Sequence, residues 1–180
     1  LTCGGVWGSS ASIRAAIQLA IIVGRSKNLL HVSLRLRKRD PVDELVVQGA
    51  RVLISINASP YHIGKRDQRR HIFANTARRH GVPVVYVNQV GGNDQLVFDG
   101  SSLAMDPTGR LIAQAASFSE DLVIADLNTG KGDNHINFTD EDEAVYEALV
   151  LGTRDYLRKC GFHKAVIGLS GGIDSSLVAC

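Results

Sequence analysis

The sequence predicts an α/β protein, and two observations carry this prediction. Between residues 41 and 126, apolar runs typical of buried strands alternate with stretches that have helical spacing, a pattern of mixed α/β domains. Near the C-terminal end, the apolar residues 165–167 predict a short buried strand. A loop rich in glycine and serine and the start of a helix follow it, in the order typical of an anion-binding edge of a parallel sheet.

Composition is that of a globular chain with a hydrophobic core. Its 180 residues are enough for one domain and the beginning of another, and 44% of them are hydrophobic. The net charge of +2 gives no reason to expect nucleic acid or an anionic membrane as a partner. Cys3, Cys160 and Cys180 lack the spacing of a disulfide framework or a zinc site, which suits a reducing cytoplasm. The most apolar window, residues 13–23, is too short to span a membrane.

The first elements after residue 40 are expected to alternate. Helices are predicted over residues 42–50 and 64–80, and strands over residues 52–56 and 84–88. The second helix is strongly charged, with an apolar side formed by Ile72, Phe73, Ala74 and Ala77. Gly81 stands where a helix C-cap is expected, and residues 91–94 read as a loop.

The next segment is predicted to be all β. Short strands are expected over residues 102–105, 111–115 and 122–125, and the turn residues 106–109 predict a hairpin between the first two.

A linker and a helix are then expected. Residues 128–139 are predicted to be an interdomain linker, with Thr139 capping a helix whose first turn is residues 140–143. The acidic first turn favours the helix dipole. The buried stripe of this helix is predicted to contain Val145, Leu149, Gly152 and Tyr156.

The loop at residues 168–176 has the chemistry of an anion cradle. Paired glycines let the backbone approach a ligand, and consecutive N–H groups and a helix N-terminus attract negative charge. Hydroxyl donors come from Ser170, Ser175 and Ser176, and Asp174 could hold a divalent cation against phosphate oxygens. No Gly-Lys-Ser/Thr follows, so this is not a P-loop. The alternative is an ordinary glycine-rich turn between a strand and a helix.

Ser-Gly-Gly-Ile-Asp-Ser at residues 170–175 resembles the pyrophosphate-binding loop of the N-type ATP pyrophosphatases. The resemblance implies ATP and Mg²⁺ as cofactors, Asp174 as a metal ligand, and the beginning of a doubly wound, adenine nucleotide α-hydrolase-like parallel sheet. It implies that ATP is bound by Gly168, Leu169, Ser170, Gly171, Gly172, Ile173, Asp174 and Ser175.

Three stretches resemble the C-terminal half of a nitrilase-type (carbon–nitrogen hydrolase) domain, an α-β-β-α sandwich. They are Ser-Ile-Asn-Ala-Ser-Pro-Tyr-His from residue 55, Val-Tyr-Val-Asn-Gln-Val-Gly-Gly from residue 85 and Phe-Asp-Gly-Ser-Ser from residue 98. This domain followed by an ATP pyrophosphatase loop resembles the layout of the glutamine-dependent NAD synthetase family. The predicted organisation is residues 1–40 unassigned, 41–127 a partial glutaminase domain, 128–139 a linker and 140–180 the start of the ATP pyrophosphatase domain.

The residues of a nitrilase-type active site are not identified in this chain. Such a glutaminase needs a Glu base, a Lys and a Cys nucleophile, and the family's nucleophile stands in a Cys-Glu pair. No Cys-Glu pair occurs here, and residues 34–40 occupy the corresponding place. Cys3 lacks a preceding strand and a following acidic residue, so no catalytic residue is assigned. Residues 1–40 are interpreted either as a frameshifted or misassembled segment or as a divergent insertion.

Two residues of the glutaminase part are candidates for binding glutamine. The resemblance implies that Ser59 contacts the α-amino or α-carboxylate group and that Lys65 pairs with the carboxylate. The alternative for Ser59 is loop capping before Pro60, and for Lys65 a solvated position in a basic helix start. His62 and His71 are expected at the surface, because neither has a second metal-binding residue at a suitable spacing.

The resemblance implies a cytoplasmic, homo-oligomeric parent enzyme that acts on small molecules. It would amidate deamido-NAD to NAD with ATP, through an adenylated intermediate and with glutamine as the nitrogen donor. The alternatives are another ATP-pyrophosphatase amidotransferase and a non-catalytic fragment. The 180-residue chain alone is expected to be inactive.

Overall fold

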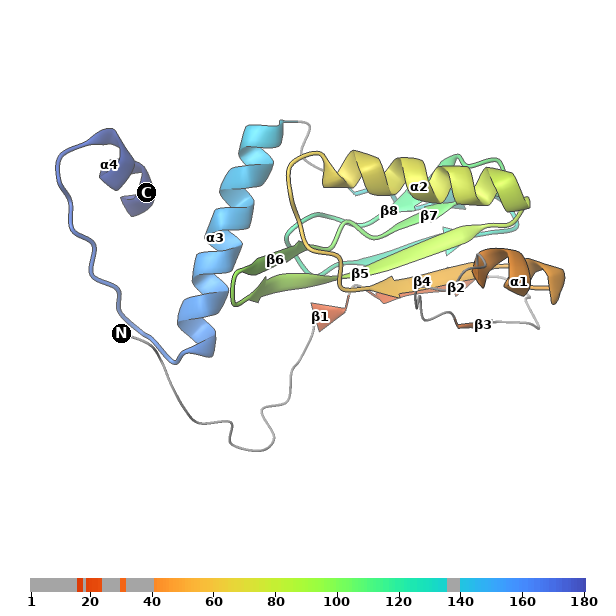
Figure 1. The fold of residues 1–180 in the computed structure, drawn as a ribbon, viewed down its shortest axis with the longest axis horizontal. Helices are drawn as coiled ribbons and strands as arrows, with labels where there is room; N and C mark the ends of the chain where they lie inside the picture. Colours follow the sequence, from red (N-terminus) through yellow and green to blue (C-terminus); the bar gives the residue numbers. More distant parts are fainter. Residues whose placement is uncertain (1–15, 18, 24–29, 32–40, 136–139) are drawn as a thin grey trace.

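The computed structural model describes residues 16–17, 19–23, 30–31, 41–135 and 140–180 (Figure 1). The helices are α1 (Pro41–Val47), α2 (Lys65–His80), α3 (Glu141–Lys159) and α4 (Ile173–Ala179). The strands are β1 (Ala16–Ile17), β2 (Leu19–Val23), β3 (Leu30–His31), β4 (Leu53–Asn57), β5 (Val84–Asn93), β6 (Leu96–Asp99), β7 (Leu103–Met105), β8 (Leu111–Gln114), β9 (Leu122–Asp126) and β10 (Lys131–Gly132).

The described strands form two sheets. The larger one has the order β3-β4-β5-β7-β8, and β1 and β6 also pair with β5. Strands β3, β4 and β5 run parallel, whereas β7 and β8 continue the sheet in antiparallel fashion. The smaller sheet has the order β10-β9-β2. The mixed α/β class predicted from the sequence is therefore confirmed.

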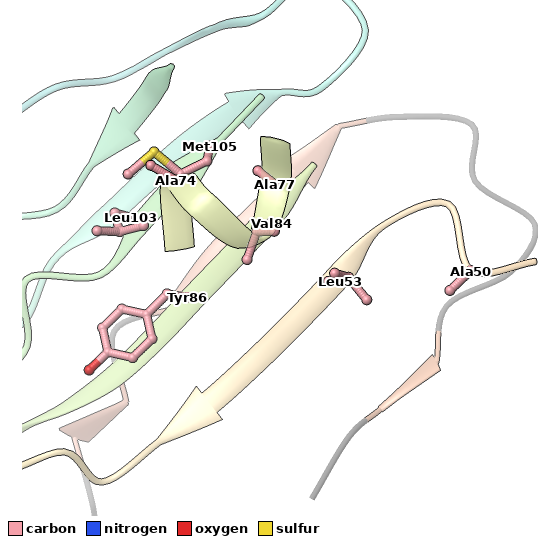
Figure 2. Packing of buried hydrophobic residues seen from close by; sticks show 8 residues of the cluster. All are labelled: Ala50, Leu53, Ala74, Ala77, Val84, Tyr86, Leu103 and Met105. Atoms are coloured by element: carbon pink, nitrogen blue, oxygen red, sulfur yellow. The ribbon is translucent and has the colours of Figure 1, made fainter. Parts of the chain in front are cut away.

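Each face of the larger sheet has its own core, because successive side chains of a strand point to opposite faces. On one face, helices α1 and α2 cover a cluster whose side chains come mainly from α2, β4, β5 and β7 (Figure 2). In it, Tyr86 of β5 packs against Phe73 of α2, with 4.6 Å between the ring centres. This cluster contains Ala50, Leu53, Ala74, Ala77, Val84, Tyr86, Leu103 and Met105. On the other face, Val85 and Val87 of β5 pack with Ala125 of β9. The helices, the larger sheet and the β9 sheet thus form successive layers.

Helix α2 follows its prediction closely, with two exceptions. It ends at Gly81, whose left-handed backbone and N–H bond to the Ala77 carbonyl make it the expected C-cap. Ile72 was predicted on the apolar side but is 52% exposed. Arg69 is buried instead, since its charge is paired inside the protein.

The β5 strand is longer than predicted. Residues 91–93 continue the strand and pair with β6, so the loop predicted at residues 91–94 is wrong except for Asp94, which lies in the turn between the two strands. The glycine pair has a packing role instead. A Cβ added at Gly92 would lie 2.9 Å from the Cα of Gly152 in α3, so glycine lets the helix approach the strand.

Helix α3 crosses the β5–β6 hairpin (Figure 1). Its N-cap is Asp140, whose carboxylate accepts the Asp142 N–H, whereas the predicted cap Thr139 lies outside the described residues. The predicted stripe is partly right, since Val145 and Gly152 are partly buried. The buried residues are Ala144, Ala148 and Leu151, while the predicted Leu149 and Tyr156 are 65% and 52% exposed. Small residues face the strand because the helix packs close to its backbone.

The segment from residue 161 to residue 172 is extended and exposed between α3 and α4 (Figure 1). The strand predicted over residues 165–167 is not formed, and Val166 is 99% exposed. A strand of a parallel sheet needs neighbours on both sides and cover on both faces, and none is present among the described residues.

The turn between β7 and β8 supports a prediction about pH. Burial acts to raise the pKa of Asp106, but hydrogen bonds from Thr108 and Arg110 outweigh it and lower the pKa to about 2. Asp106→Asn is expected to lower the free energy of unfolding by about 2 kcal/mol at neutral pH.

A depressed carboxylate pKa stabilises the folded state above the unfolded value of 3.8, and this stabilisation is lost as pH falls towards 2. Urea titrations across this range should therefore show the wild type and the Asn variant converging. Glu120→Gln, at an exposed position, is the control and should show no such convergence. A difference that did not depend on pH would contradict the prediction.

Candidate functional site

The loop after β4 holds Ser59 through its backbone. The Ser59 N–H donates to Asn88 Oδ1 at 2.8 Å, and Asn88 Nδ2 donates back to the Ser59 carbonyl at 3.1 Å. Asn88 is fully buried in β5, and its own N–H donates to Ser102 Oγ at 3.0 Å. This reciprocal pair fixes the loop on the neighbouring strand.

A buried ion pair supports the same loop from α2. Arg69 Nη1 donates to both carboxylate oxygens of Asp99, at 2.7 and 2.8 Å, and both side chains are almost completely buried. Arg69 Nη2 donates to the carbonyls of Ser59 and Pro60. Ser101 Oγ donates to Asp99 Oδ2 at 3.0 Å. Burying two charges is tolerated only when such further hydrogen bonds satisfy them.

Two polar atoms beside this network are left without a hydrogen bond. Within the described part of the chain, Arg69 Nε and the Tyr86 hydroxyl are buried and have no partner. Burial raises the pKa of Tyr86 to about 12, although the Arg69 charge opposes this rise. The Arg69 guanidinium also lies 5.8 Å from the centre of the Tyr86 ring. Unsatisfied buried polar atoms are rare and mark a place where water or a ligand can bind.

Lys65 lies at the other end of this loop, as the first residue of α2. Its backbone N–H donates to the His62 carbonyl at 3.0 Å. Among the described residues, no hydrogen bond or ion pair engages its ammonium group. The two predicted glutamine ligands therefore stand on one short segment, Ser59 held by its backbone and Lys65 with a free cation. His62 and His71 are exposed, as predicted.

The loop at residues 168–176 is closed by its own serines. Ser170 Oγ lies 3.1 Å from Ser175 Oγ and accepts the Gly172 N–H at 3.4 Å. The hydroxyls of Ser175 and Ser176 donate to the Gly172 carbonyl at 3.0 and 2.9 Å. Gly171 has a φ of 83°, a conformation that glycine adopts without strain. The two glycines therefore form a tight turn before α4, a geometry that both the predicted anion cradle and the alternative of an ordinary turn contain.

Asp174 stands in the first turn of α4 and is exposed. Across the described ranges, no group of three or more His, Cys, Asp or Glu side chains could hold a metal ion. A single carboxylate still fits Mg²⁺, which commonly takes one or two protein carboxylates together with phosphate oxygens and water. No described helix is long and apolar enough to cross a membrane.

The sequence analysis missed the residues beneath Ser59. Asn88 could have been noticed, because it is a polar residue that directly follows the apolar residues 84–87 at the start of β5. Arg69 could not, because it is one of several basic residues in the first half of α2 and only the partner Asp99 distinguishes it. Cys3 lies outside the described residues.

Two family models match the chain. Residues 41–133 match the carbon–nitrogen hydrolase family, which is more than half of the chain, and residues 145–180 match the NAD synthase family.

Individual relatives agree with these matches. The chain is 47% identical over 145 residues to a glutamine-dependent NAD(+) synthetase of Synechocystis, covering 78% of this chain and 26% of that protein. It is 43% identical to one of Rhodobacter capsulatus, again covering 78% of this chain and 26% of the relative. The chain thus spans about a quarter of the length of these curated relatives.

A solved structure has the same fold. The glutamine-dependent NAD+ synthetase of Acinetobacter baumannii, in complex with ADP, is 37% identical and superposes with a TM-score of 0.70, covering 77% of this chain and 27% of that one. The resemblance stated from the sequence is confirmed. The chain belongs to the carbon–nitrogen hydrolase family, continues into NAD synthase sequence, and is a relative of the glutamine-dependent NAD(+) synthetases.

Proposed function

We propose that the chain is part of an enzyme that makes NAD from deamido-NAD with glutamine as the nitrogen donor. The observation that carries this proposal is the presence of carbon–nitrogen hydrolase and NAD synthase sequence in one chain. A carbon–nitrogen hydrolase releases ammonia when it cleaves an amide, and an amidating synthase consumes ammonia. A different ATP-pyrophosphatase amidotransferase would not place NAD synthase sequence after residue 144.

The proposed reaction has two steps at the second site. The nicotinate carboxylate attacks the α-phosphate of ATP, which forms an acyl adenylate and releases pyrophosphate. Ammonia then attacks the acyl carbon, and AMP leaves. Mg²⁺, when bound by Asp174 and the phosphates, neutralises the negative charge of the leaving group. The residues proposed to bind ATP remain residues 168–175, and the ADP complex of the Acinetobacter relative supports binding of an adenine nucleotide by such an enzyme.

The loop geometry supports binding by backbone and hydroxyl groups. The turn at Gly171 and Gly172 leaves no side chain between the backbone and a ligand. The hydroxyls of Ser170 and Ser175 can turn from each other towards phosphate oxygens. Asp174 is exposed and engages no described hydrogen bond, so its carboxylate is available to a metal.

Ser59 and Lys65 are proposed to bind glutamine at the first site. The network of Asn88 and Arg69 fixes the Ser59 backbone, so less conformational freedom remains to be lost when its side chain binds a ligand. The free ammonium group of Lys65 suits the α-carboxylate of glutamine. The two exposed cysteines, Cys160 and Cys180, and the substrates support a cytoplasmic location. The homo-oligomeric state stays a prediction from the resemblance.

Lys65→Ala, made in a full-length protein that contains this sequence, tests the glutamine assignment. Loss of one charge-assisted hydrogen bond should cost about 1.5–3 kcal/mol and raise the KM for glutamine by roughly 10- to 100-fold. Synthesis driven by added ammonium chloride should be unchanged, because the defect lies only in the first site. NAD formation is measured with each nitrogen donor.

Two further variants sharpen this test. Lys65→Arg keeps the positive charge and should retain part of the affinity for glutamine. Lys131→Ala removes an equal charge from an exposed position in β10 and should change neither activity. Equal losses with glutamine and with ammonia in Lys65→Ala would contradict the assignment.

A further inference from the structure

Glu141, in the first turn of α3, contacts the segment between the Ser59 loop and α2. Its Oε1 accepts the Tyr61 hydroxyl at 3.0 Å and the Gly64 N–H at 3.2 Å. Its Oε2 pairs with Arg66 Nη2 at 3.4 Å. An ionised carboxylate accepts several hydrogen bonds at once, so one side chain of α3 binds three groups of this segment.

These contacts stand on both sides of Lys65. Gly64 precedes it and Arg66 follows it, and Glu141 holds both. Gly64 has a left-handed backbone with a φ of 77° and caps α2 without a side-chain hydrogen bond. The bond to Glu141 therefore supplies the side-chain acceptor that helix ends commonly have. The position of Lys65 follows from that of its two neighbours.

Tyr61 anchors the segment in the core beneath α3. Its ring meets Phe118 edge to face, with 5.2 Å between the ring centres, and its N–H donates to the Val97 carbonyl at 2.7 Å. Burial and the bond to Glu141 raise the pKa of Tyr61 to about 12, so the hydroxyl is a donor at neutral pH. Although burial acts to raise it, the bonds from Tyr61, Gly64 and Arg66 lower the pKa of Glu141.

The other end of α3 is also fixed to the hydrolase part. Asp155 Oδ2 accepts the Gly92 N–H at 2.8 Å, and Lys159 Nζ donates to the Gly92 carbonyl. The helix is therefore held at both ends. It leads from the Lys65 segment to the segment that precedes the loop at residues 168–176.

We propose that Glu141 is a positioning residue that holds Lys65 for glutamine binding and thereby ties the glutamine site to the helix that leads to the ATP loop. This proposal rests on the proposed function. The new element is that Glu141 lies outside the carbon–nitrogen hydrolase match, which ends at residue 133. If Glu141 only stabilised α3, its loss would lower NAD synthesis equally with glutamine and with ammonia. If it positions Lys65, its loss lowers synthesis with glutamine and spares synthesis with ammonia.

The test compares Glu141→Ala, Glu141→Gln and Tyr61→Phe in the full-length protein. In Glu141→Ala, the KM for glutamine should rise roughly tenfold, as expected for the loss of hydrogen bonds to a charged group, with ammonia-driven synthesis retained. Glu141→Gln keeps an acceptor for Tyr61 and Gly64 and should show a smaller rise. Tyr61→Phe keeps the ring contact with Phe118 and should show a rise between those of the two Glu141 variants.

The matched control is Glu143→Ala. It removes the same charge from the same helix turn at an exposed position, and both activities should stay at the wild-type level. Hydrogen–deuterium exchange of residues 61–66, measured in the same proteins, should accelerate in Glu141→Ala and not in the control.

The outcomes separate the two proposals. An unchanged KM for glutamine in Glu141→Ala, or equal losses with both nitrogen donors, would overturn the role of Glu141. A wild-type protein that makes no NAD even from ammonia would instead contradict the proposed function. In that case hydrogen–deuterium exchange decides the role of Glu141. Unchanged exchange at residues 61–66 in Glu141→Ala would overturn this role, and faster exchange would support it.

Discussion

Asp99→Ala is expected to lower the free energy of unfolding by about 3–5 kcal/mol, since it leaves the Arg69 guanidinium buried without its anion. Urea titration followed by circular dichroism measures this loss. The same change should loosen the loop of Ser59, because Arg69 also donates to the Ser59 and Pro60 carbonyls.

A compensating variant tests the physical reason for this loss. Arg69→Met combined with Asp99→Leu removes both charges and should recover much of the stability, as apolar replacements of buried ion pairs do elsewhere. Asp67→Ala, at an exposed position of the same helix, is the control and should cost less than about 1 kcal/mol. A loss for Asp99→Ala no larger than that of the control would contradict the assignment of a stabilising buried pair.

Asp174→Ala is expected to abolish pyrophosphate release in a full-length protein that contains this sequence. The carboxylate is the proposed ligand of Mg²⁺, and without the metal the charge on the leaving pyrophosphate is not neutralised. Pyrophosphate is measured after addition of ATP and deamido-NAD. The fold should be unaffected, because Asp174 is exposed and engages no described hydrogen bond.

Two comparisons isolate the role of the Asp174 carboxylate. Leu177→Ala alters an exposed side chain of the same short helix and should leave pyrophosphate release near the wild-type rate. Hydrolysis of glutamine by the first site should also persist in Asp174→Ala. Normal turnover of the Asp174 variant would show that the loop at residues 168–176 does not hold the metal and the phosphates.

The local elements could be predicted because their causes are local. The apolar runs of β4 and β5, the Gly81 cap of α2 and the turn at residues 106–109 each depend on neighbours in the sequence. The serine and glycine pattern at residues 168–176 likewise determined a tight loop before a helix, since glycine conformation and hydroxyl bonding act over a few residues.

The sequence by itself thus determined the family and most of the helices and strands between residues 41 and 159, and the roles of the two candidate sites stay predictions. Tertiary structure alone decided which charges are buried and which face of α3 is covered. Arg69 and Asp99 lie 30 positions apart, and Glu141 reaches Gly64 across 77, so no local pattern marks these pairs. The covered face of α3 is the one that packs against Gly92 of β5. Residues 165–167 are exposed and form no strand, because a strand is stabilised by the neighbouring strands and helices of its sheet.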